Sequence, residues 1–309
     1  MCAPGGAEAG RNDGRYPRSA ETVTVVSNEE IADGVFSLAV SRRPVSAATG
    51  PLVPAIPRSV PAPGPGQFFM IRARPSAVFL GRPISVYRSD AASVTFLILN
   101  KGEGTAELCA LRAGDRADLV GPVGNTFRSP AALAALGARR LAPDGASVSK
   151  AELALIDALP AKPRIAVLGG GIGVAPVAGF ALDPSSETGL EAGSFDFYAA
   201  FRTGSYALEG IAERARRVIV TTEDGSVGAK GMLPAVFNGA DYDLVYACGP
   251  TPMLKYVKEA CAGLLAYVSL ERRMACGAGA CLGCTVETAN GNRRCCVDGP
   301  VFPASEVLF

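Results

Sequence analysis

The chain has 309 residues, with 30 Lys and Arg against 29 Asp and Glu and a formal net charge of +1. This balance predicts neither a nucleic acid nor an anionic membrane surface as partner. His is absent, which excludes a Ser-His-Asp triad, a His general base, a Rieske centre and a His-ligated haem. The length suggests roughly two to three domains, and no apolar run is long enough to predict a membrane span.

The two ends of the chain differ sharply in composition. Residues 1–19 are rich in Gly, Ala and Arg, so we expect them to be disordered, and they lack the apolar region of a signal peptide. Five of the nine cysteines crowd into the last 34 residues, which favours a metal site over disulfides spread along the chain. These features predict a reducing, cytoplasmic location.

Residues 20–127 contain short apolar strands separated by Gly and Pro, the pattern of a small antiparallel β-barrel. The strands are expected at 22–26, 35–40, 67–71, 82–87 and 94–99. A Pro-rich segment, 44–65, is expected to be a surface insertion. A short helix is expected over 106–111.

The expected barrel carries one candidate dinucleotide-binding segment, Arg82-Pro83-Ile84-Ser85 with Tyr87. A guanidinium can bind phosphate oxygens, Ser85 can bond a ring nitrogen or carbonyl, and Tyr87 can stack. Gly104 and Thr105, at the start of the expected helix, add a second anion-suited feature because free N–H groups point there. Taken alone, a solvated surface loop and a structural glycine explain these two features better.

After a predicted linker and insertion, 128–162, with a short helix over 130–138, strands and helices alternate. A continuous apolar strand at 164–168 is typical of buried parallel sheets. Further strands are expected at 195–199, 218–221 and 244–248, and helices at 207–216, 232–238 and 251–265. The alternation predicts a doubly wound parallel α/β domain over 163–265, followed by a small third module over 266–309.

Two segments of the expected α/β domain are suited to bind a nucleotide. Gly169, Gly170, Gly171 and Gly173 lie between a buried strand and a helix, the context in which glycines bind phosphates. Cys248-Gly249-Pro250 ends the last strand, at the carboxyl edge where ligands bind. The alternatives are a tight strand–helix turn for the glycines and a small buried hydrophobic side chain for Cys248.

The segment Glu223-Asp224-Gly225-Ser226 also follows a strand and could meet a ribose or form an ordinary turn. No basic cluster demands a 2′-phosphate, which favours NAD over NADP.

The C-terminal module contains Cys276, Cys281 and Cys284, with Cys296 further along. This C-x4-C-x2-C…C spacing is the plant-type pattern for a [2Fe–2S] cluster held by four thiolates, and Gly277, Gly279 and Gly283 allow the loop to bend around it. A disulfide pair or a zinc knuckle is the alternative, although zinc sites favour paired C-x2-C or Cys/His sets. Of the adjacent Cys295 and Cys296, we expect Cys296 to be the fourth ligand and Cys295 a spare thiol.

The Arg82 segment, the Gly169–Pro176 loop with Cys248-Gly-Pro250, and the cysteine loop occur in an order that resembles the ferredoxin–NADP reductase superfamily. Within it, Glu271-Arg-Arg-Met-Ala-Cys276 and Cys296-Val-Asp-Gly-Pro-Val-Phe302 are similar to electron-transfer subunits of NAD-dependent dihydroorotate dehydrogenases of type B. The resemblance covers residues 20–309 apart from the two insertions, which are longer than is usual in the family. Cys295 also departs from the family, in which an apolar residue is usual at this position.

The resemblance implies FAD between the barrel and the nucleotide domain. The implied FAD contacts are Arg82, Pro83, Ile84, Ser85, Leu97, Ile98, Leu99, Gly104 and Thr105. It also implies Cys276, Cys281, Cys284 and Cys296 as iron ligands. An FMN-containing catalytic subunit would oxidise dihydroorotate in pyrimidine (UMP) biosynthesis, and its electrons would pass through the [2Fe–2S] cluster and FAD to NAD+. We expect a heterotetramer with two copies of each subunit.

Two other interpretations stay open. A subunit of an electron-bifurcating NADH–ferredoxin oxidoreductase, or a diaphorase-type hydrogenase subunit, shares the same parts. An Asp in place of one cluster ligand would favour the bifurcating enzyme, but four Cys are present here. A non-enzymatic iron–sulfur sensor would not need intact flavin and nicotinamide loops.

Overall fold

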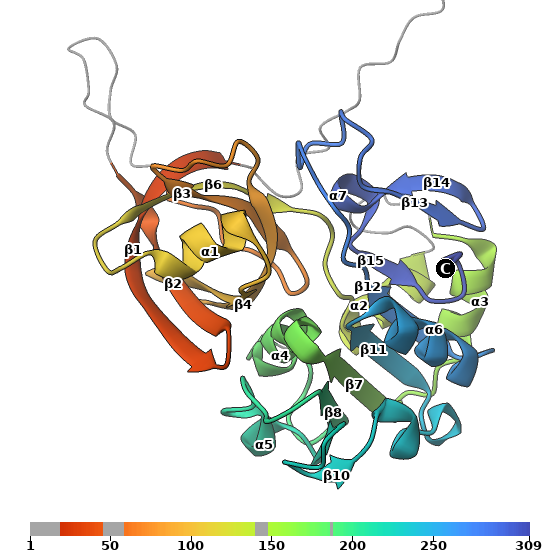
Figure 1. Cartoon of the computed structure of the whole chain (residues 1–309). Coiled ribbons are helices and arrows are strands. Elements are labelled where there is room, and N and C mark those ends of the chain that lie inside the picture. Colours follow the sequence, from red (N-terminus) through yellow and green to blue (C-terminus); the bar gives the residue numbers. More distant parts are fainter. Residues whose placement is uncertain (1–18, 46–58, 140–147, 186–187) are drawn as a thin grey trace, which may run out of the picture.

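The computed structural model describes residues 19–45, 59–139, 148–185 and 188–309 (Figure 1). The N-terminal segment expected to be disordered, apart from Ser19, lies outside these residues. So do the centre of the Pro-rich insertion, 46–58, and residues 140–147 of the second insertion.

Six antiparallel strands close into a barrel in the order β1-β2-β5-β4-β3-β6, which confirms the predicted barrel. They are β1 (Ser19–Ala32), β2 (Val35–Pro44), β3 (Phe68–Arg74), β4 (Arg82–Ser89), β5 (Ser93–Leu99) and β6 (Arg116–Val123). Alternate apolar side chains fill the interior, and the rings of Phe69 and Phe96 meet edge to face at 5.8 Å.

Helix α1 (Glu103–Ala110) packs on the barrel and begins three residues earlier than expected. The earlier start has a local cause. The Thr105 hydroxyl accepts from the N–H groups of Lys101 and Gly102 and donates to the Gly102 carbonyl, which caps the first turn.

The second part of the chain forms a seven-stranded sheet in the order β10-β9-β8-β7-β11-β12-β15, with helices on its faces. Six strands are parallel and β15 runs antiparallel to β12. They are β7 (Ile165–Gly170), β8 (Phe195–Phe201), β9 (Arg217–Thr222), β10 (Ala229–Lys230), β11 (Leu244–Cys248), β12 (Leu265–Ser269) and β15 (Val301–Pro303). The predicted doubly wound parallel sheet is thus confirmed.

Three of the predicted helices are wrong in whole or in part. Only Ile211–Arg214 (α5) is helical within 207–216, because Gly210 precedes it in the left-handed region. Within 232–238 only a 3-10 turn, Leu233–Ala235, forms. The third, α6 (Thr251–Ala260), ends five residues early, because Gly263 has positive φ and the apolar run after it becomes β12.

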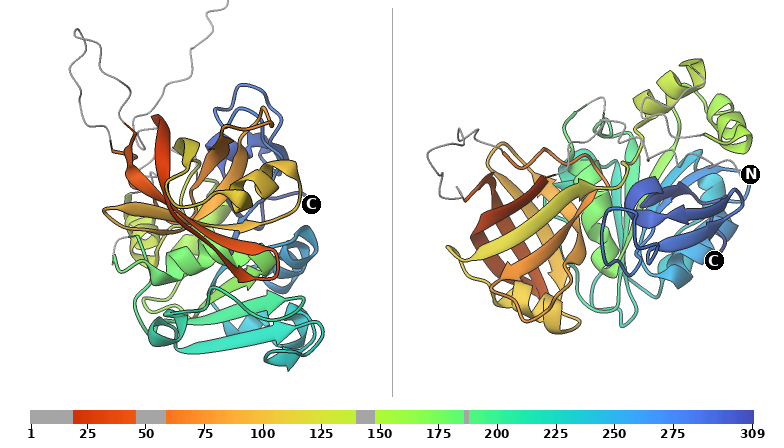
Figure 2. Two further views of the ribbon diagram at one scale, coloured as in Figure 1. Left: turned by 60° about the vertical axis from the view of Figure 1, so that its left-hand side comes forward. Right: turned by 90° about the horizontal axis from the view of Figure 1, so that it is seen from above.

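Helix α4 (Val174–Leu182) lies between the barrel and the sheet (Figure 2). Its Gly179 packs on the backbone of Tyr87 in β4, where no Cβ would fit. One aromatic cluster links the barrel to the sheet: it contains Phe127 from the segment after β6, Phe180 of α4 and Tyr246 of β11. The barrel and the sheet therefore share a packed core.

Helices α2 (Pro130–Arg139) and α3 (Lys150–Asp157) pack on the same face of the sheet as α4, and α6 packs on the opposite face. The last elements, β13 (Thr285–Thr288), β14 (Gly291–Arg294) and α7 (Cys295–Asp298), sit beside the β12–β15 edge (Figure 1). Among the described residues, no helix has the length and apolarity needed to cross a membrane.

Candidate functional site

The predicted phosphate-binding Arg82 lies directly against the first turn of α1. A Cβ at Gly104 would overlap the Arg82 guanidinium, so only glycine lets the side chain lie there. Arg82 Nε is buried and has no hydrogen-bond partner within the described structure. A buried, unpaired donor is unfavourable unless a ligand satisfies it. Arg82 and the α1 N-terminus therefore fit an anionic group such as a dinucleotide pyrophosphate.

The other predicted flavin contacts divide between two sides of the barrel wall. The side chains of Ile84 and Ile98 pack in the barrel core, so only their backbone is free to meet a cofactor. Leu97 points outward into the core shared with α4, and Pro83, Ser85 and Leu99 are half-buried. Because side chains alternate in direction along β4 and β5, only some of the predicted flavin contacts face the sheet.

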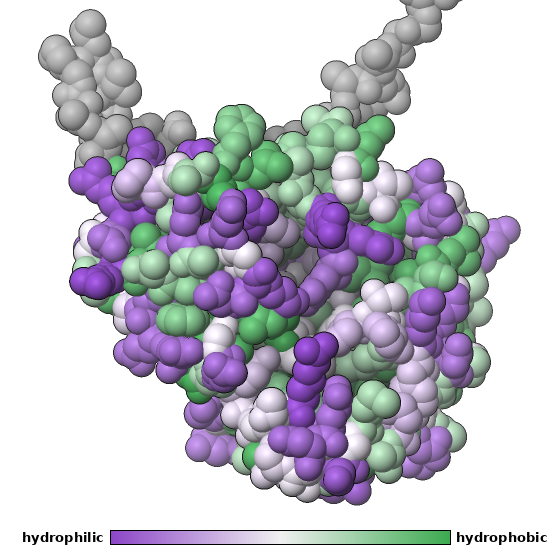
Figure 3. Space-filling view, in the orientation of Figure 1, coloured by the Kyte–Doolittle hydropathy of each residue, from purple (hydrophilic) through white to green (hydrophobic). Residues whose placement is uncertain are grey.

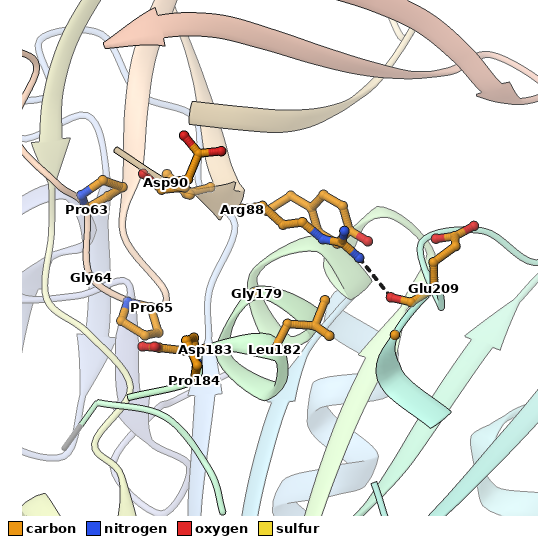
Figure 4. A pocket seen from close by; sticks show the side chains of 14 residues that line it. Pro63, Gly64, Pro65, Arg88, Asp90, Gly179, Leu182, Asp183, Pro184 and Glu209 are labelled. Carbon is orange, nitrogen blue, oxygen red and sulfur yellow. Dashed lines mark hydrogen bonds between the residues drawn. The ribbon is translucent and has the colours of Figure 1, made fainter. Parts of the chain in front are cut away.

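Tyr87 lies in a different environment from Arg82. It is buried against α4, and the Arg88 guanidinium stacks 4.8 Å from its ring centre. Both line a cavity of about 490 Å³ between β4, α4 and the start of α5, where Arg88 donates to the Glu209 carbonyl at 2.8 Å (Figure 4). Tyr87 is the one predicted site residue in this cavity, so the cavity is separate from the Arg82 group.

The two segments of the sheet that are predicted to bind a nucleotide lie side by side. Gly169 pairs with Cys248 in the β7–β11 ladder. A Cβ on Gly173 would lie 2.6 Å from the Cys248 carbonyl oxygen, so the glycine loop and Cys248-Gly249-Pro250 are in backbone contact. Gly171, in contrast, faces open space with a φ of +53°. The two segments thus form one edge with little side-chain bulk, which suits the close approach of a nucleotide phosphate.

Glu271, Tyr206 and Lys101 interact near this edge, and none of them was among the predicted site residues. Glu271 follows the end of β12, and burial raises the pKa of its carboxyl against the effect of nearby Lys101. Burial and the Glu271 charge together raise the pKa of Tyr206 to about 12. Burial also raises the pKa of Cys248 far above that of a free thiol, again with Glu271 nearby. Lys101 comes from the barrel, so only the fold reveals this grouping.

The four predicted iron ligands come from one loop and one short helix, α7. Cys276 and Cys281 are accessible, whereas Cys284 and Cys296 are buried. Backbone N–H groups point at three sulfurs: Ala278 at Cys276 (3.3 Å), Gly283 at Cys281 (3.5 Å) and Cys296 at Cys284 (3.4 Å). Amides aimed at sulfur stabilise thiolates and tune cluster potentials.

Backbone amides also change the acidity of the loop cysteines. Donation from Cys281 N–H, and then from Ala278 and Ala280, lowers the pKa of Cys276 to about 6 despite desolvation. Burial raises the pKa of Cys296 to about 12. A bound cation would favour the thiolate form of Cys296 against the effect of its burial.

The glycines of the loop are not equivalent. Gly277 and Gly279 adopt positive φ and leave no room for a Cβ, as expected. Gly283 has room and an ordinary φ, so the prediction for it is wrong. The turn is made instead by Leu282, at φ +58° with 62% of its surface exposed.

The structure favours Cys296 over Cys295 as the fourth ligand. The thiol of Cys295 donates to the Leu270 carbonyl at 3.4 Å, away from the loop. The Cys296 N–H faces Cys284, and the two thiols interact. Among the described residues, no three His, Cys, Asp or Glu side chains converge on a single metal ion. A cluster with two irons and bridging sulfides does not require its thiolates to meet at one point.

The architecture matches solved flavoprotein reductases. A NADH-dependent reduced ferredoxin-NADP oxidoreductase superimposes with a TM-score of 0.66 at 23% identity, covering 93% of this chain and 89% of that one. A ferredoxin reductase of carbazole 1,9a-dioxygenase gives a TM-score of 0.53 at 19% identity, covering 81% and 66%. These similarities define the fold class, an antiparallel barrel packed against a parallel sheet as in these solved reductases.

Sequence comparison is more specific. The model for the iron-sulfur cluster binding domain of dihydroorotate dehydrogenase B matches residues 271–308. The electron transfer subunit of dihydroorotate dehydrogenase B (NAD(+)) from Clostridium acetobutylicum is 35% identical over 79% of this chain and 86% of its own length. Those from Clostridium perfringens and Streptococcus mutans are each 34% identical, over 92% and 94% of this chain and 96% and 98% of their own lengths. The chain belongs to this family of electron transfer subunits.

Proposed function

We propose that the chain carries electrons from the FMN of a dihydroorotate-oxidising catalytic subunit, through a [2Fe–2S] cluster and FAD, to NAD+ in pyrimidine biosynthesis. The single observation that carries the proposal is the cysteine loop, in which four thiols and their amides are arranged between the barrel and the sheet. An iron–sulfur sensor would not need the orphaned Arg82 donor and the open glycine edge beside this loop.

The chain's own residues would hold the cofactors in distinct ways. Arg82 and the Gly104 N–H would bind the FAD pyrophosphate, whereas the Thr105 N–H already donates to the Gly102 carbonyl at 3.0 Å. Cys276, Cys281, Cys284 and Cys296 would hold the iron. When bound, FAD supplies hydride exchange with NAD and single-electron exchange with the cluster.

The nicotinamide nucleotide would bind at the carboxyl edge of the sheet. The glycine loop, Gly169 to Gly173, would offer N–H groups to its phosphates, and Cys248-Gly249-Pro250 would form the floor. The Asp224 carboxylate accepts from the Ser226 N–H and hydroxyl after β9, and this turn would bring its negative charge to the ribose 2′-hydroxyl of NAD. That charge disfavours a 2′-phosphate, in support of NAD.

We propose that the catalytic subunit docks beside the cluster loop. Apolar surface lines the upper edge of the molecule, above the barrel and the cluster module (Figure 3). Leu282, next to Cys281, exposes 62% of its surface and would add an apolar contact for the docked subunit. The proposed assembly holds two copies of each subunit. The free thiols of the described cysteines support a cytoplasmic setting.

The test is to co-purify the chain anaerobically with an FMN-containing dihydroorotate-oxidising subunit and to measure dihydroorotate-dependent NAD+ reduction. Cys281→Ser should retain FAD-dependent NADH oxidation by artificial acceptors but lose the coupled reaction. Cys109→Ser is the matched control, because Cys109 is a barrel cysteine remote from the loop. Coupled orotate production that survives Cys281→Ser, or anaerobic protein free of iron and sulfide, would refute the proposal.

A further inference from the structure

The segment that carries the fourth cysteine is attached to the sheet and to the barrel by separate contacts. On the sheet side, the Leu270 N–H donates to the Pro300 carbonyl at 2.9 Å, and Val301 begins β15. On the barrel side, the contacts come from the chain that leaves β6 and passes beside this segment (Figure 1).

Asn125 makes the polar contacts on the barrel side. Its backbone N–H donates to the Gly299 carbonyl at 2.6 Å. Its Nδ2 donates to the carbonyls of Asp298 (3.2 Å) and Val301 (2.9 Å), and its Oδ1 accepts from Val301 N–H at 3.0 Å. Both side-chain donors and the acceptor are thus used on residues two to five positions after Cys296. Among the amino acids of this size, Asn alone supplies two donors and an acceptor at once.

The neighbours of Asn125 hold it at a fixed place on the barrel. Gly124 has a φ of +84°, and a Cβ there would lie 2.6 Å from both the Gly299 oxygen and Pro300 Cδ. The Gly124 carbonyl accepts from Gln67 Nε2 at 2.7 Å, and Gln67 is fully buried. Asn125 is therefore a rigid point of the barrel that reaches the cluster segment.

A second contact links the same loop to the predicted flavin strand. Met70 of β3 pairs with Pro83 of β4 and packs on Gly277, next to Cys276, where a Cβ would lie 2.7 Å from Met70 Cγ. Phe68 and Met70 share one core cluster with Cys284, Cys295 and Cys296. The cysteine loop thus rests on the strand that neighbours the proposed flavin-binding strand.

We propose that Asn125 is a positioning residue that fixes the Cys296 segment on the barrel and thereby sets the separation of cluster and flavin. The inference rests on the proposed function. Electron transfer between two centres weakens steeply as their separation grows, so a side chain that joins their two supports controls its rate. Outer-shell partners of metal ligands have effects of this kind.

The experiment uses the full chain with its FAD and iron, in complex with the catalytic subunit. NADH is mixed anaerobically with wild type and Asn125→Ala, and flavin and cluster absorbance are followed in the same trace. Each NADH would give FAD two electrons as a hydride and be oxidised to NAD+; the oxidised cluster would accept one of these electrons and FAD would keep the other. Flavin reduction is therefore the internal reference for cluster reduction.

We expect cluster reduction in Asn125→Ala to be about tenfold slower relative to flavin reduction, with shifted EPR g values. Asn125→Asp keeps the acceptor for Val301 N–H but loses both donors, so its rate should be intermediate. Asn28→Ala is the matched control. Asn28 also makes three bonds, to carbonyls at the end of α1, but lies away from the cysteine loop. It should lower stability and leave cluster reduction unchanged.

Wild-type rates and g values in Asn125→Ala would overturn the inference. Loss of iron from both Asn125 variants with FAD retained would support it, because the Cys296 segment would then be unsupported. Joint loss of FAD and iron would overturn it, since Asn125 would then serve the barrel as a whole. A wild-type chain without iron would instead refute the proposed function, and this inference with it.

Discussion

Replacing Arg82 with Met should change FAD affinity and the stability of the FAD-free protein in opposite directions. Arg82 Nε is buried without a partner in the described protein, so it contributes no internal hydrogen bond to the apoprotein. Removing an unsatisfied buried donor relieves about 1–3 kcal/mol of desolvation penalty. Met conserves most of the side-chain length and packs well beside Gly104. The FAD-free Arg82→Met chain should therefore be as stable as wild type or more stable.

FAD binding should respond in the opposite direction. A hydrogen bond from a charged donor to phosphate contributes about 1.5–3 kcal/mol, so its loss should raise the FAD dissociation constant about 10- to 150-fold. Flavin fluorescence titration gives the dissociation constant, and thermal melting of the flavin-free protein gives the stability.

Arg72→Met is the control for this pair of measurements. Arg72 lies on β3 and pairs with Asp118 at 3.0 Å with 39% of its side chain exposed, so it should leave FAD binding unchanged. Unchanged FAD affinity in Arg82→Met, combined with a destabilised apoprotein, would contradict the assignment of Arg82.

Two further predictions concern buried charge in the sheet. Asp196 is fully buried, and desolvation alone would raise the pKa of its carboxyl. Hydrogen bonds from Arg216, Arg217 and the Tyr242 hydroxyl outweigh this effect and hold the pKa far below its usual range. The ionised carboxylate therefore stabilises the folded protein fully above the unfolded pKa near 4, and this stabilisation is lost as the pH falls below that value. Asp196→Asn should lower the unfolding free energy by about 3–5 kcal/mol at pH 7. It should also flatten the decline of the unfolding free energy below about pH 4 in urea titrations; an unchanged decline would exclude Asp196 as its source. Tyr267→Phe removes a buried hydroxyl that donates to the Glu152 carboxylate at 2.6 Å, and should lower the unfolding free energy by about 1.5–3 kcal/mol. Unaltered urea denaturation would show that α3 does not depend on this bond.

Local patterns were sufficient wherever the deciding contacts are close in sequence. The barrel strands follow from short apolar alternation, and β7 follows from a continuous apolar run that ends in glycines. The patterns failed in 207–216 and 251–265. In the first segment, Gly210 with positive φ shortens the helix despite its helix-forming composition. In the second, the last residues pair with β11 as strand β12 instead of continuing the helix.

The sequence by itself determined the cluster loop and the glycine edge, because ligand spacing and strand-to-helix turns are encoded within a few residues. Tertiary structure decided that Arg82 lies on Gly104, that Cys295 turns to Leu270 while Cys296 faces Cys284, and that Asn125 holds the segment after Cys296. These contacts join residues from different strands and loops. Their neighbours depend on strand order and on how barrel and sheet pack, which no local pattern of side chains specifies.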